Sequence, residues 1–315
     1  MFETVLVAHR GPLALRVVRT LQRLGVQAVT VHSGLDATAR HVTQADESVL
    51  LGPAEPAASY LDGARVLEAA RRTGAQAVHP GCGALAEDPA FARAVVTAGL
   101  VWIGPDPAVV GRGRGPRGSV GVQLLGAGGQ VLAVGEHLVR AGGPDALDAT
   151  TDRDEALREA AVRAAVDVEG LATVELDPGS AGPEVRRLTP RLQAGHTVTE
   201  VAYDVDLVEL QLLAAAGAPV TWRPGAARGV ALAARVYAGA PGRLTAWAEP
   251  VGVRVDSGFV AGDTVPPLYD PLLAVVTVLG RDRADAGHLL HDALGGFTVG
   301  GVPTNLPRLL ERLHP

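Results

Sequence analysis

Short apolar runs alternate with amphipathic stretches over the first hundred residues, and this pattern constrains the fold more than any other feature. It is expected when parallel strands are joined by crossover helices. The expected strands are residues 4–8, 28–31, 48–51, 77–79 and 101–103. The expected helices are residues 12–24, 60–73 and 91–98. We therefore predict an α/β fold whose N-terminal part is a doubly wound parallel sheet with helices on both faces.

After residue 118 the pattern changes to hairpins and helices, as in an α+β fold. The expected strands are residues 120–125, 130–134, 172–176, 185–188, 231–237 and 251–256, with turns at 126–129 and 178–180. The expected helices are residues 151–168, 205–216 and 283–294, and residues 271–279 fit either a helix or a strand. Thr151 and Asp152 are available as N-caps of the first of these helices, with Glu155, Arg158 and Glu159 on its solvent face.

Residues 111–118, with the sequence GRGRGPRG, interrupt this pattern. Such a run can wrap a phosphate with its backbone amides, but the same composition is typical of a flexible, solvated linker. No apolar strand leads directly into the run and no lysine follows it, which favours the linker. We therefore predict an N-terminal domain of residues 1–110, a linker at 111–118, a second domain of residues 119–220 and a C-terminal domain of residues 221–315.

The composition excludes several classes of function. All 28 basic residues are arginine, which excludes Schiff-base catalysis, a phosphate-loop lysine and a lysine-attached biotin. A net charge of −6 argues against nucleic acid as a partner. The sequence has a single cysteine, Cys82, no basic leader and no apolar run near the ~20 residues of a membrane span. We therefore expect a cytoplasmic protein without a membrane segment.

Three segments occur in an order that is specific to one family: HRGPLALR at 9–16, AVHPGCGALAE at 77–87 and RLQAGHTVTE at 191–200. Shorter matches follow at 206–212, 234–238, 253–258, 269–274 and 301–305. The chain resembles biotin carboxylase, the ATP-grasp component of acetyl-CoA and propionyl-CoA carboxylases. The resemblance implies a pre-ATP-grasp N-terminal domain, a truncated ATP-grasp domain and a biotin-carboxylase-type C-terminal region. In that family ATP and Mg²⁺ activate bicarbonate, and CO₂ is transferred to biotin on a carrier.

The resemblance also implies catalytic positions, several of which carry other residues here. Glu175 matches one metal-binding glutamate, but Arg187 stands where the second glutamate is expected and Thr189 where an asparagine is expected. Gly195 matches the family's general base, and the lid expected between residues 105 and 122 is reduced to the Gly/Arg run. A metal ion bound beside Glu175 would meet the positive charge of Arg187. Two like charges about 4 Å apart repel by roughly 4 kcal/mol at an effective dielectric near 20. We therefore expect no metal and no cofactor, with ATP, Mg²⁺ and biotin bound only if the family activity is retained.

The anion-binding end of the family's site is retained. Arg191, Gln193 and Arg235 match the residues that hold bicarbonate and stabilise the enolate-like form of biotin, Arg235 supplying the positive charge. These three are candidate substrate-binding residues, and Arg191 and Arg235 are also the candidate catalytic residues. Alternatively, both arginines form ion pairs with nearby acids such as Glu175 or Glu200.

Other residues of the matching segments are weaker candidates. Glu87 matches a family residue and either binds substrate or orders the loop 81–83. Cys82 replaces a family tyrosine, and because no base can be assigned to it we interpret it as a small apolar filler. Structural hydrogen bonding is expected for His9, His79 and His196, and a solvated face for His288 and His291.

Three functions remain open. The leading hypothesis is a lid-less biotin carboxylase homologue that has lost ATP-dependent carboxylation and serves in binding, scaffolding or regulation. The second is a working carboxylase subunit, whose partners by resemblance are a biotinyl carrier and carboxyltransferase subunits. The third is a binder of small anions or biotin through Arg191 and Arg235. A weak homodimer is conceivable through Arg19 and Arg254, while Arg23 replaces a glutamate there and sets like charges against each other.

Overall fold

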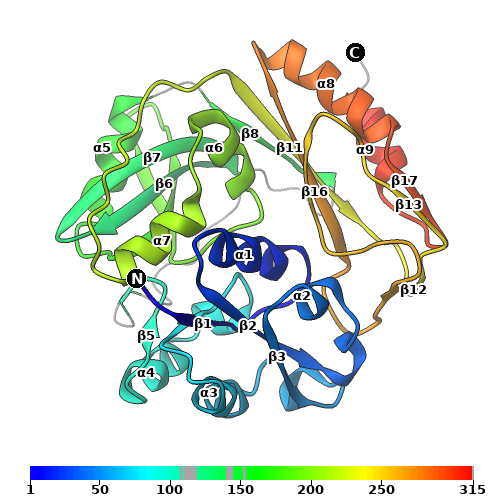
Figure 1. Ribbon diagram of the computed structural model, residues 1–315. Coiled ribbons are helices and arrows are strands. Elements are labelled where there is room, and N and C mark those ends of the chain that lie inside the picture. Colours follow the sequence, from blue (N-terminus) through cyan, green and yellow to red (C-terminus); the bar gives the residue numbers. More distant parts are fainter. Residues whose placement is uncertain (107–108, 110–118, 140–144, 152–153, 314–315) are drawn as a thin grey trace.

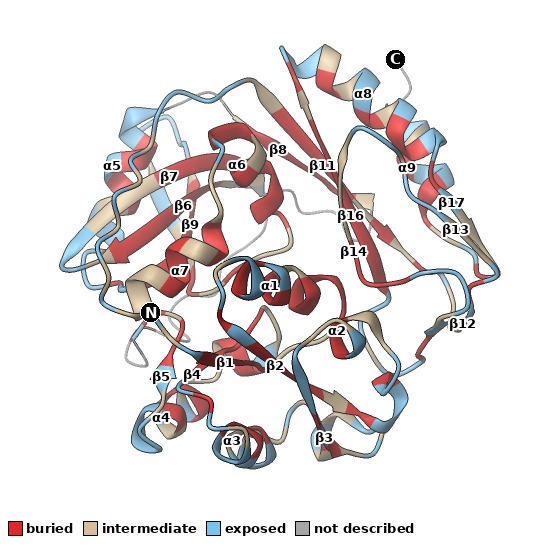
Figure 2. Ribbon diagram, viewed as in Figure 1, coloured by how far each residue is buried: buried red, intermediate tan, exposed pale blue. Residues whose placement is uncertain are grey.

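The computed structural model describes residues 1–106, 109, 119–139, 145–151 and 154–313. Two sheets form the framework, one of five strands from the N-terminal third and one of eight strands from the rest. Helix α1 (Gly11–Arg23) lies between the two sheets (Figure 1). Buried residues follow the strands of both sheets and the inward faces of the helices (Figure 2).

The N-terminal sheet is parallel, as the alternating pattern predicts. Its strand order is β3 (Glu47–Gly52), β2 (Gln27–Ser33), β1 (Thr4–Val7), β4 (Ala77–His79), β5 (Val101–Trp102). Val5 and Val7 pack against α1, whereas Leu6 packs on the other side against α3 (Gly63–Arg72) and α4 (Pro89–Thr97). Helices therefore cover both faces, and the predicted doubly wound layout is confirmed. Shorter helical segments are α2 (Arg40–Thr43), η1 (Gly34–Asp36), η2 (Pro56–Ala58) and η3 (Ala84–Glu87).

Capping residues set the ends of these helices. Asp62 accepts a hydrogen bond from the backbone N–H of Arg65, so α3 begins at Gly63 and not at the predicted residue 60. Gly25, with φ +72°, ends α1 in the left-handed conformation, and the N–H of Val26 reaches back to the carbonyl of Leu21. The predicted stop at Gly25 is thus confirmed.

The eight-stranded sheet is antiparallel throughout its assigned pairs. Its order is β10 (Glu184–Thr189), β9 (Gly170–Asp177), β6 (Ser119–Ala127), β7 (Gln130–Val139), β8 (Leu147–Thr150), β11 (Val230–Tyr237), β16 (Leu272–Gly280), β14 (Arg254–Ser257). Hydrogen bonding continues from β8 into β11, so the sheet is not interrupted at the domain boundary predicted near residue 220. Two small two-stranded sheets pair β12 (Gly242–Arg243) with β15 (Thr264–Val265), and β13 (Ala246–Ala248) with β17 (Thr298–Gly300).

Helices cover both faces of this sheet. Helix α5 (Glu155–Ala164) packs on Val122, Leu124 and Val174, and α8 (Arg283–Gly295) packs on the same face further along, beside α9 (Leu306–Leu313). The opposite face is covered by α6 (His196–Tyr203), α7 (Leu207–Ala215) and α1. Residues alternate along each strand between these two layers. The layer formed by α6, α7 and α1, which lies between the two sheets, contains the candidate site.

Several sequence expectations are corrected by these elements. Arg158, predicted on a solvent face, is only 3% exposed because its guanidinium is hydrogen-bonded to the buried Glu136 on β7. Helix α5 starts after Asp154, which caps it, and the predicted cap Asp152 and the run 111–118 lie outside the described residues. The segment 271–279, which fits either a helix or a strand in the sequence, belongs to strand β16 (Leu272–Gly280) apart from Pro271. Helix α6 was not predicted because its threonines and valines lack apolar helical spacing.

Candidate functional site

The polar residues of the candidate site lie on the sheet face that α6, α7 and α1 cover. In β9, Val174 and Leu176 pack against α5, so alternation places Thr173 and Glu175 on the opposite face. Across the β9–β10 pair, Glu175 lies directly opposite Arg187. Thr173 lies opposite Thr189 in the same pairing. The polar floor of the site is therefore built by strand register, and it brings together all the positions the resemblance assigns to metal binding.

Two arginines converge on one glutamate at the edge of this floor. Glu87 Oε1 accepts hydrogen bonds from Arg191 Nε at 2.6 Å and from Arg187 Nη2 at 3.4 Å. Glu87 comes from η3 in the N-terminal part of the chain, so this cluster also joins the two sheets. The ion-pair alternative for Arg191 describes the structure, but with Glu87 as the acid in place of Glu175 or Glu200.

The donor set at Glu175 does not fit a pair of magnesium ions. Magnesium takes about six oxygen ligands in near-octahedral geometry, and carboxylates are its usual protein ligands. Here Arg187 lies directly opposite Glu175 in the strand pairing, with its guanidinium hydrogen-bonded to Glu87, and Thr189 offers a neutral hydroxyl two residues later. Across the residues the structure describes, no group of three or more His, Cys, Asp or Glu side chains is placed to hold a metal ion. This donor set is therefore unsuited to a pair of magnesium ions.

Arg235 is paired with a carboxylate that the sequence reasoning did not identify. Its Nη2 lies 2.7 Å from Oδ1 and 2.6 Å from Oδ2 of Asp148 on the neighbouring strand β8. Burial opposes the charge of Arg235, but Asp148 outweighs it and raises the pKa of the guanidinium. Asp148 lies in the short strand β8, outside all the segments that resemble the family, so no motif pointed to it.

Gln193 and Gly195 lie in the turn that leads into α6. The backbone carbonyl of Gln193 accepts hydrogen bonds from the N–H of His196 at 3.1 Å and from His196 Nδ1 at 2.7 Å. Gly195 is buried beside Asp148: a Cβ added to this glycine would lie 3.0 Å from the carboxyl carbon of Asp148. The turn thus brings the family's base position next to the counter-ion of Arg235.

The loop 81–83 is ordered by a histidine and not by Glu87. The N–H of Gly81 donates to Nδ1 of His79 at 3.0 Å, and His79 Nε2 lies 3.3 Å from Gln211 Oε1. The sequence assigned no base to Cys82, but the structure places a histidine beside it: His9 Nε2 lies 3.1 Å from Cys82 Sγ. Burial raises the pKa of Cys82 to about 11, and burial with Arg10 lowers that of His9 to about 3. Both groups are therefore neutral near pH 7, which does not favour a thiolate nucleophile.

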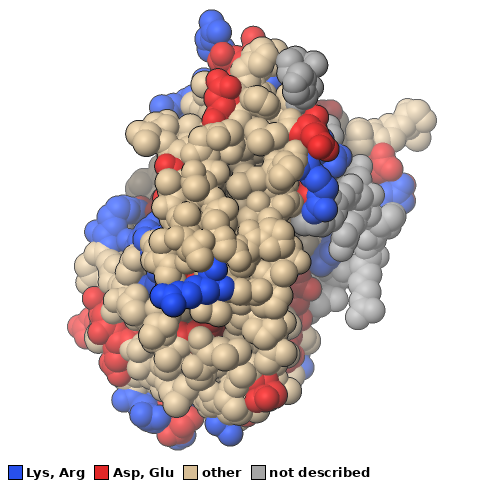
Figure 3. Space-filling view, turned by 90° about the vertical axis from the view of Figure 1, so that its right-hand side faces the viewer, with Lys and Arg blue, Asp and Glu red and all other residues tan. Residues whose placement is uncertain are grey.

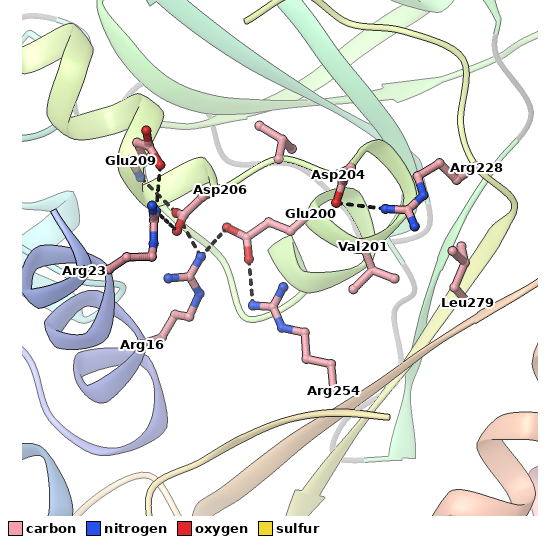
Figure 4. Close-up of a pocket in the computed structure, with 11 residues that line it drawn as sticks. Arg16, Arg23, Glu200, Val201, Asp204, Asp206, Glu209, Arg228, Arg254 and Leu279 are labelled. Carbon is pink, nitrogen blue, oxygen red and sulfur yellow. Dashed lines mark hydrogen bonds and ion pairs between the residues drawn. The ribbon is translucent and has the colours of Figure 1, made fainter. Parts of the chain in front are cut away.

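A separate cavity of about 500 Å³ is lined by four arginines and four acids (Figure 4). At its centre the buried Glu200 binds Arg16 at 2.8 Å and Arg254 at 2.6 Å. Asp206 binds Arg16 at 2.9 Å and Arg23 at 2.8 Å. Burial raises the pKa of Asp206, but Arg16 and the backbone N–H of Glu209 outweigh burial and hold it well below the usual range. The four arginines and four acids balance in charge. Arg23 is paired within the chain with Asp206 and Glu209.

The surface shown in Figure 3 is largely uncharged, with arginines and acids scattered over it. It has no continuous basic band among the residues drawn, and such a band is the usual footprint of phosphate-backbone binding. Among the described residues, no helix combines the length and the apolar character needed to cross a bilayer.

The chain is similar to known proteins in both sequence and structure. Residues 1–110 match the family model described as biotin carboxylase, N-terminal domain, and residues 233–314 match that of the biotin carboxylase C-terminal domain. The chain is 30% identical over 428 residues to biotin carboxylase of Halalkalibacterium halodurans, with 100% of this chain and 95% of the relative covered. It is 29% identical to the mitochondrial propionyl-CoA carboxylase alpha chain of Homo sapiens, with 98% of this chain covered. It spans 58% of the length of that alpha chain.

Solved structures share the fold over the whole chain. The urea carboxylase of Kluyveromyces lactis superposes with a TM-score of 0.91 at 32% identity, over 100% of this chain and 31% of that chain. The biotin carboxylase domain of Hydrogenobacter thermophilus 2-oxoglutarate carboxylase, a dimer solved with MgADP, ADP and bicarbonate, also gives 0.91. That likeness, at 24% identity over 99% of this chain and 94% of the other, supports the fold alone.

Proposed function

Because the chain belongs to the biotin carboxylase family, we propose that it is a member without ATP-dependent carboxylation of biotin, retained for binding, scaffolding or regulation. The observation that carries this proposal is Arg187 lying directly opposite Glu175. A guanidinium there takes the position at which the resemblance implies a second metal-binding carboxylate. A divalent ion about 4 Å from it would be repelled by roughly 8 kcal/mol at an effective dielectric near 20. The proposal therefore includes no Mg²⁺, ATP or biotin as cofactor.

Three further observations support the proposal. Gly195 offers no side chain to accept a proton from bicarbonate. The alignment with the bacterial biotin carboxylase runs over 428 residues, although this chain has 315, so roughly a hundred positions of the relative have no counterpart. The chain also has no lysine to contact nucleotide phosphates. Phosphoryl transfer depends on positioning and charge neutralisation, and each of these features removes part of that apparatus.

The partners remain those implied by the relatives. Several are named as the alpha chain or subunit alpha of acyl-CoA carboxylases. We propose that this chain contacts a biotinyl carrier or carboxyltransferase subunit without supplying catalysis. The weak homodimer through Arg19 and Arg254 and the cytoplasmic location stay predictions.

Nucleotide turnover tests the proposal. We expect purified protein, given ATP, Mg²⁺, bicarbonate and free biotin, to show no bicarbonate-dependent phosphate release above a no-enzyme blank. The bacterial biotin carboxylase of Halalkalibacterium halodurans, assayed in parallel, is the positive control. Calorimetry with Mg-ATP is expected to show no saturable heat. Bicarbonate- and magnesium-dependent hydrolysis by this chain would overturn the proposal.

The working-subunit alternative predicts a different result. If a partner supplies the missing parts, Mg-ATP should bind once a biotinylated carrier domain is present. The same calorimetry is therefore repeated with the carrier. Binding that appears only in the complex favours the alternative, whereas its absence in both samples disposes of it.

A further inference from the structure

Asp148 and Arg235 are held together by the sheet. Asp148 lies directly opposite Ala233 in the β8–β11 pair, and Arg235 is two residues further along β11 on the same face. Such diagonal neighbours are within reach of a long side chain. Asp148 is 5% exposed and Arg235 is half-buried, so the pair is largely removed from water. A carboxylate at this depth needs a counter-charge, and Arg235 supplies it.

Gly195 provides the room for this carboxylate. Its backbone, with φ −75° and ψ 0°, is an ordinary right-handed conformation that any residue adopts, so the glycine is not required for the turn. A Cβ at this position would instead lie 3.0, 3.1 and 3.2 Å from Cγ, Oδ1 and Oδ2 of Asp148. These approaches are tighter than most Cβ contacts, so Asp148 would have to shift by a few tenths of an ångström to admit a side chain. A glutamate here would also set a second negative charge against Asp148, and both effects favour glycine.

Asp148 and Tyr237 both interact with the guanidinium of Arg235, but they leave its Nε unused. Both oxygens of Asp148 approach the same terminal nitrogen, Nη2. The Nε of Arg235 is buried and has no hydrogen-bond partner in the described structure. The favoured geometry of a carboxylate on arginine uses two parallel N–H donors, so an oxyanion free to orient itself can bind Nε and Nη2 together. The Arg235 site is therefore shaped for a small planar oxyanion and is filled by an internal one.

We propose that the carboxylate implied at residue 195 has been relocated to Asp148, which occupies the Arg235 site as a built-in ligand and excludes external oxyanions of carboxylate shape. The ligand class is defined by the two donors: formate, acetate and bicarbonate all present two oxygens in one plane. This inference rests on the proposed function, because a site filled by its own side chain suits a chain that does not turn over bicarbonate. Within that function, the inference identifies Arg235 as an anion-binding residue and Asp148 as the side chain that occupies it.

The first test removes the internal ligand. Thermal unfolding of the wild type, Asp148→Ala and Asp148→Asn is followed over a titration of sodium acetate, with sodium chloride at equal ionic strength as reference. We expect acetate to stabilise both variants saturably, with an affinity at least tenfold higher than for the wild type. Asp177→Ala, which removes an exposed carboxylate of β9, is the matched control and should gain nothing. Replacing Arg235 by Gln in the Asp148→Ala background should abolish the gain.

The second test exchanges the two positions. Gly195→Glu is expected to lower the unfolding midpoint strongly in the wild type, and Asp148→Ala combined with Gly195→Glu should recover most of it. Equal destabilisation in both backgrounds, or acetate binding to the wild type as tightly as to Asp148→Ala, would overturn the inference. Both readouts are independent of nucleotide. Bicarbonate-dependent ATP hydrolysis would therefore overturn the proposed function without changing either unfolding result. If acetate fails to stabilise the Asp148 variants, the inference about Asp148 is wrong, whereas the proposed lack of ATP hydrolysis is unaffected.

Discussion

Single side chains decide the charge of the site. Arg187 places a cation opposite Glu175, and Glu87 and Asp148 then neutralise Arg191 and Arg235. Every one of these contacts joins residues that lie far apart along the chain or on different strands. Each of the two arginines that the resemblance assigns to anion binding therefore has an internal acid as its partner.

Buried histidines make the stability of the fold dependent on pH. His79 is fully buried, and its Nδ1 accepts a hydrogen bond from the N–H of Gly81, which requires a neutral ring. Burial lowers its pKa to about 4 from 6.5, although Gln211 opposes the shift. Between these two values the unfolded chain binds a proton that the folded chain does not, so stability is present above pH 6.5 and is lost as pH falls toward 4.

We expect His79 to account for about 3 kcal/mol of this loss. Urea unfolding measured at several values between pH 7.5 and pH 4.5 gives the profile. His79→Asn should make it shallower, the rest of the slope coming from the buried His9 and His41, whereas His288→Asn, at an exposed position on α8, should leave it unchanged. A His79→Asn profile as steep as that of the wild type would contradict the assignment.

At the scale of elements, one buried ion pair attaches helix α5 to the sheet. The Nη2 of Arg158 lies 2.6 Å from Oε2 of Glu136 on β7, and Tyr203 adds its hydroxyl to the same oxygen at 3.3 Å. Glu136 has no exposed surface. Since removing one partner leaves an uncompensated charge in the interior, the pair holds α5 in one position on the sheet.

Arg158→Met is expected to destabilise the protein by about 3–5 kcal/mol, because Glu136 is left unpaired. Adding Glu136→Leu should restore most of that stability, since neither charge is then buried. Chemical denaturation of the wild type, both single variants and the double variant measures the coupling. Arg163→Ala, whose partner Glu159 is exposed on the same helix, should change stability by less than about 0.5 kcal/mol. Simple additivity of the two core substitutions would show that the pair is not coupled.

At the scale of the whole molecule, charged contacts connect the two sheets. Glu200 on α6 binds Arg16 of α1 and Arg254 of β14 and also accepts the N–H of Leu207 at 2.7 Å. Tyr269 donates to Ser33 Oγ at 2.6 Å, which adds a second connection. The N-terminal sheet and the larger sheet are therefore connected by buried ion pairs around α1. We expect the two sheets to unfold together.

Glu200→Ala tests this cooperativity. We expect a loss of about 3–5 kcal/mol, because two arginines lose a buried counter-ion. We also expect calorimetry to resolve two transitions in place of one as the sheets uncouple. Glu159→Ala is the exposed control and should keep a single transition near the wild-type midpoint. A single, equally sharp transition for Glu200→Ala would show that the sheets are joined by other contacts.

The local sequence determined the elements and the family. Strands β1 to β4, helix α1 and both predicted hairpins follow from apolar spacing and turn residues, because these signals act over a few neighbouring residues. The residues at 187, 189 and 195 could also be compared with the family from the sequence, since each lies in a segment where the resemblance implies a residue of another type. The presence of Arg191 and Arg235 could be predicted in the same way.

The tertiary structure alone decided what those arginines bind. Asp148 meets Arg235 through the pairing of β8 with β11, and Glu87 meets Arg191 across 104 positions of sequence. Arg158 is buried because Glu136 lies beneath α5, although helical spacing placed it in solvent. Partner choice between distant charges depends on strand register and layer packing, and no local pattern in one sequence encodes either. The physical reason is that secondary structure arises from neighbours along the chain, whereas a buried charge is stabilised by whichever opposite charge the fold brings beside it.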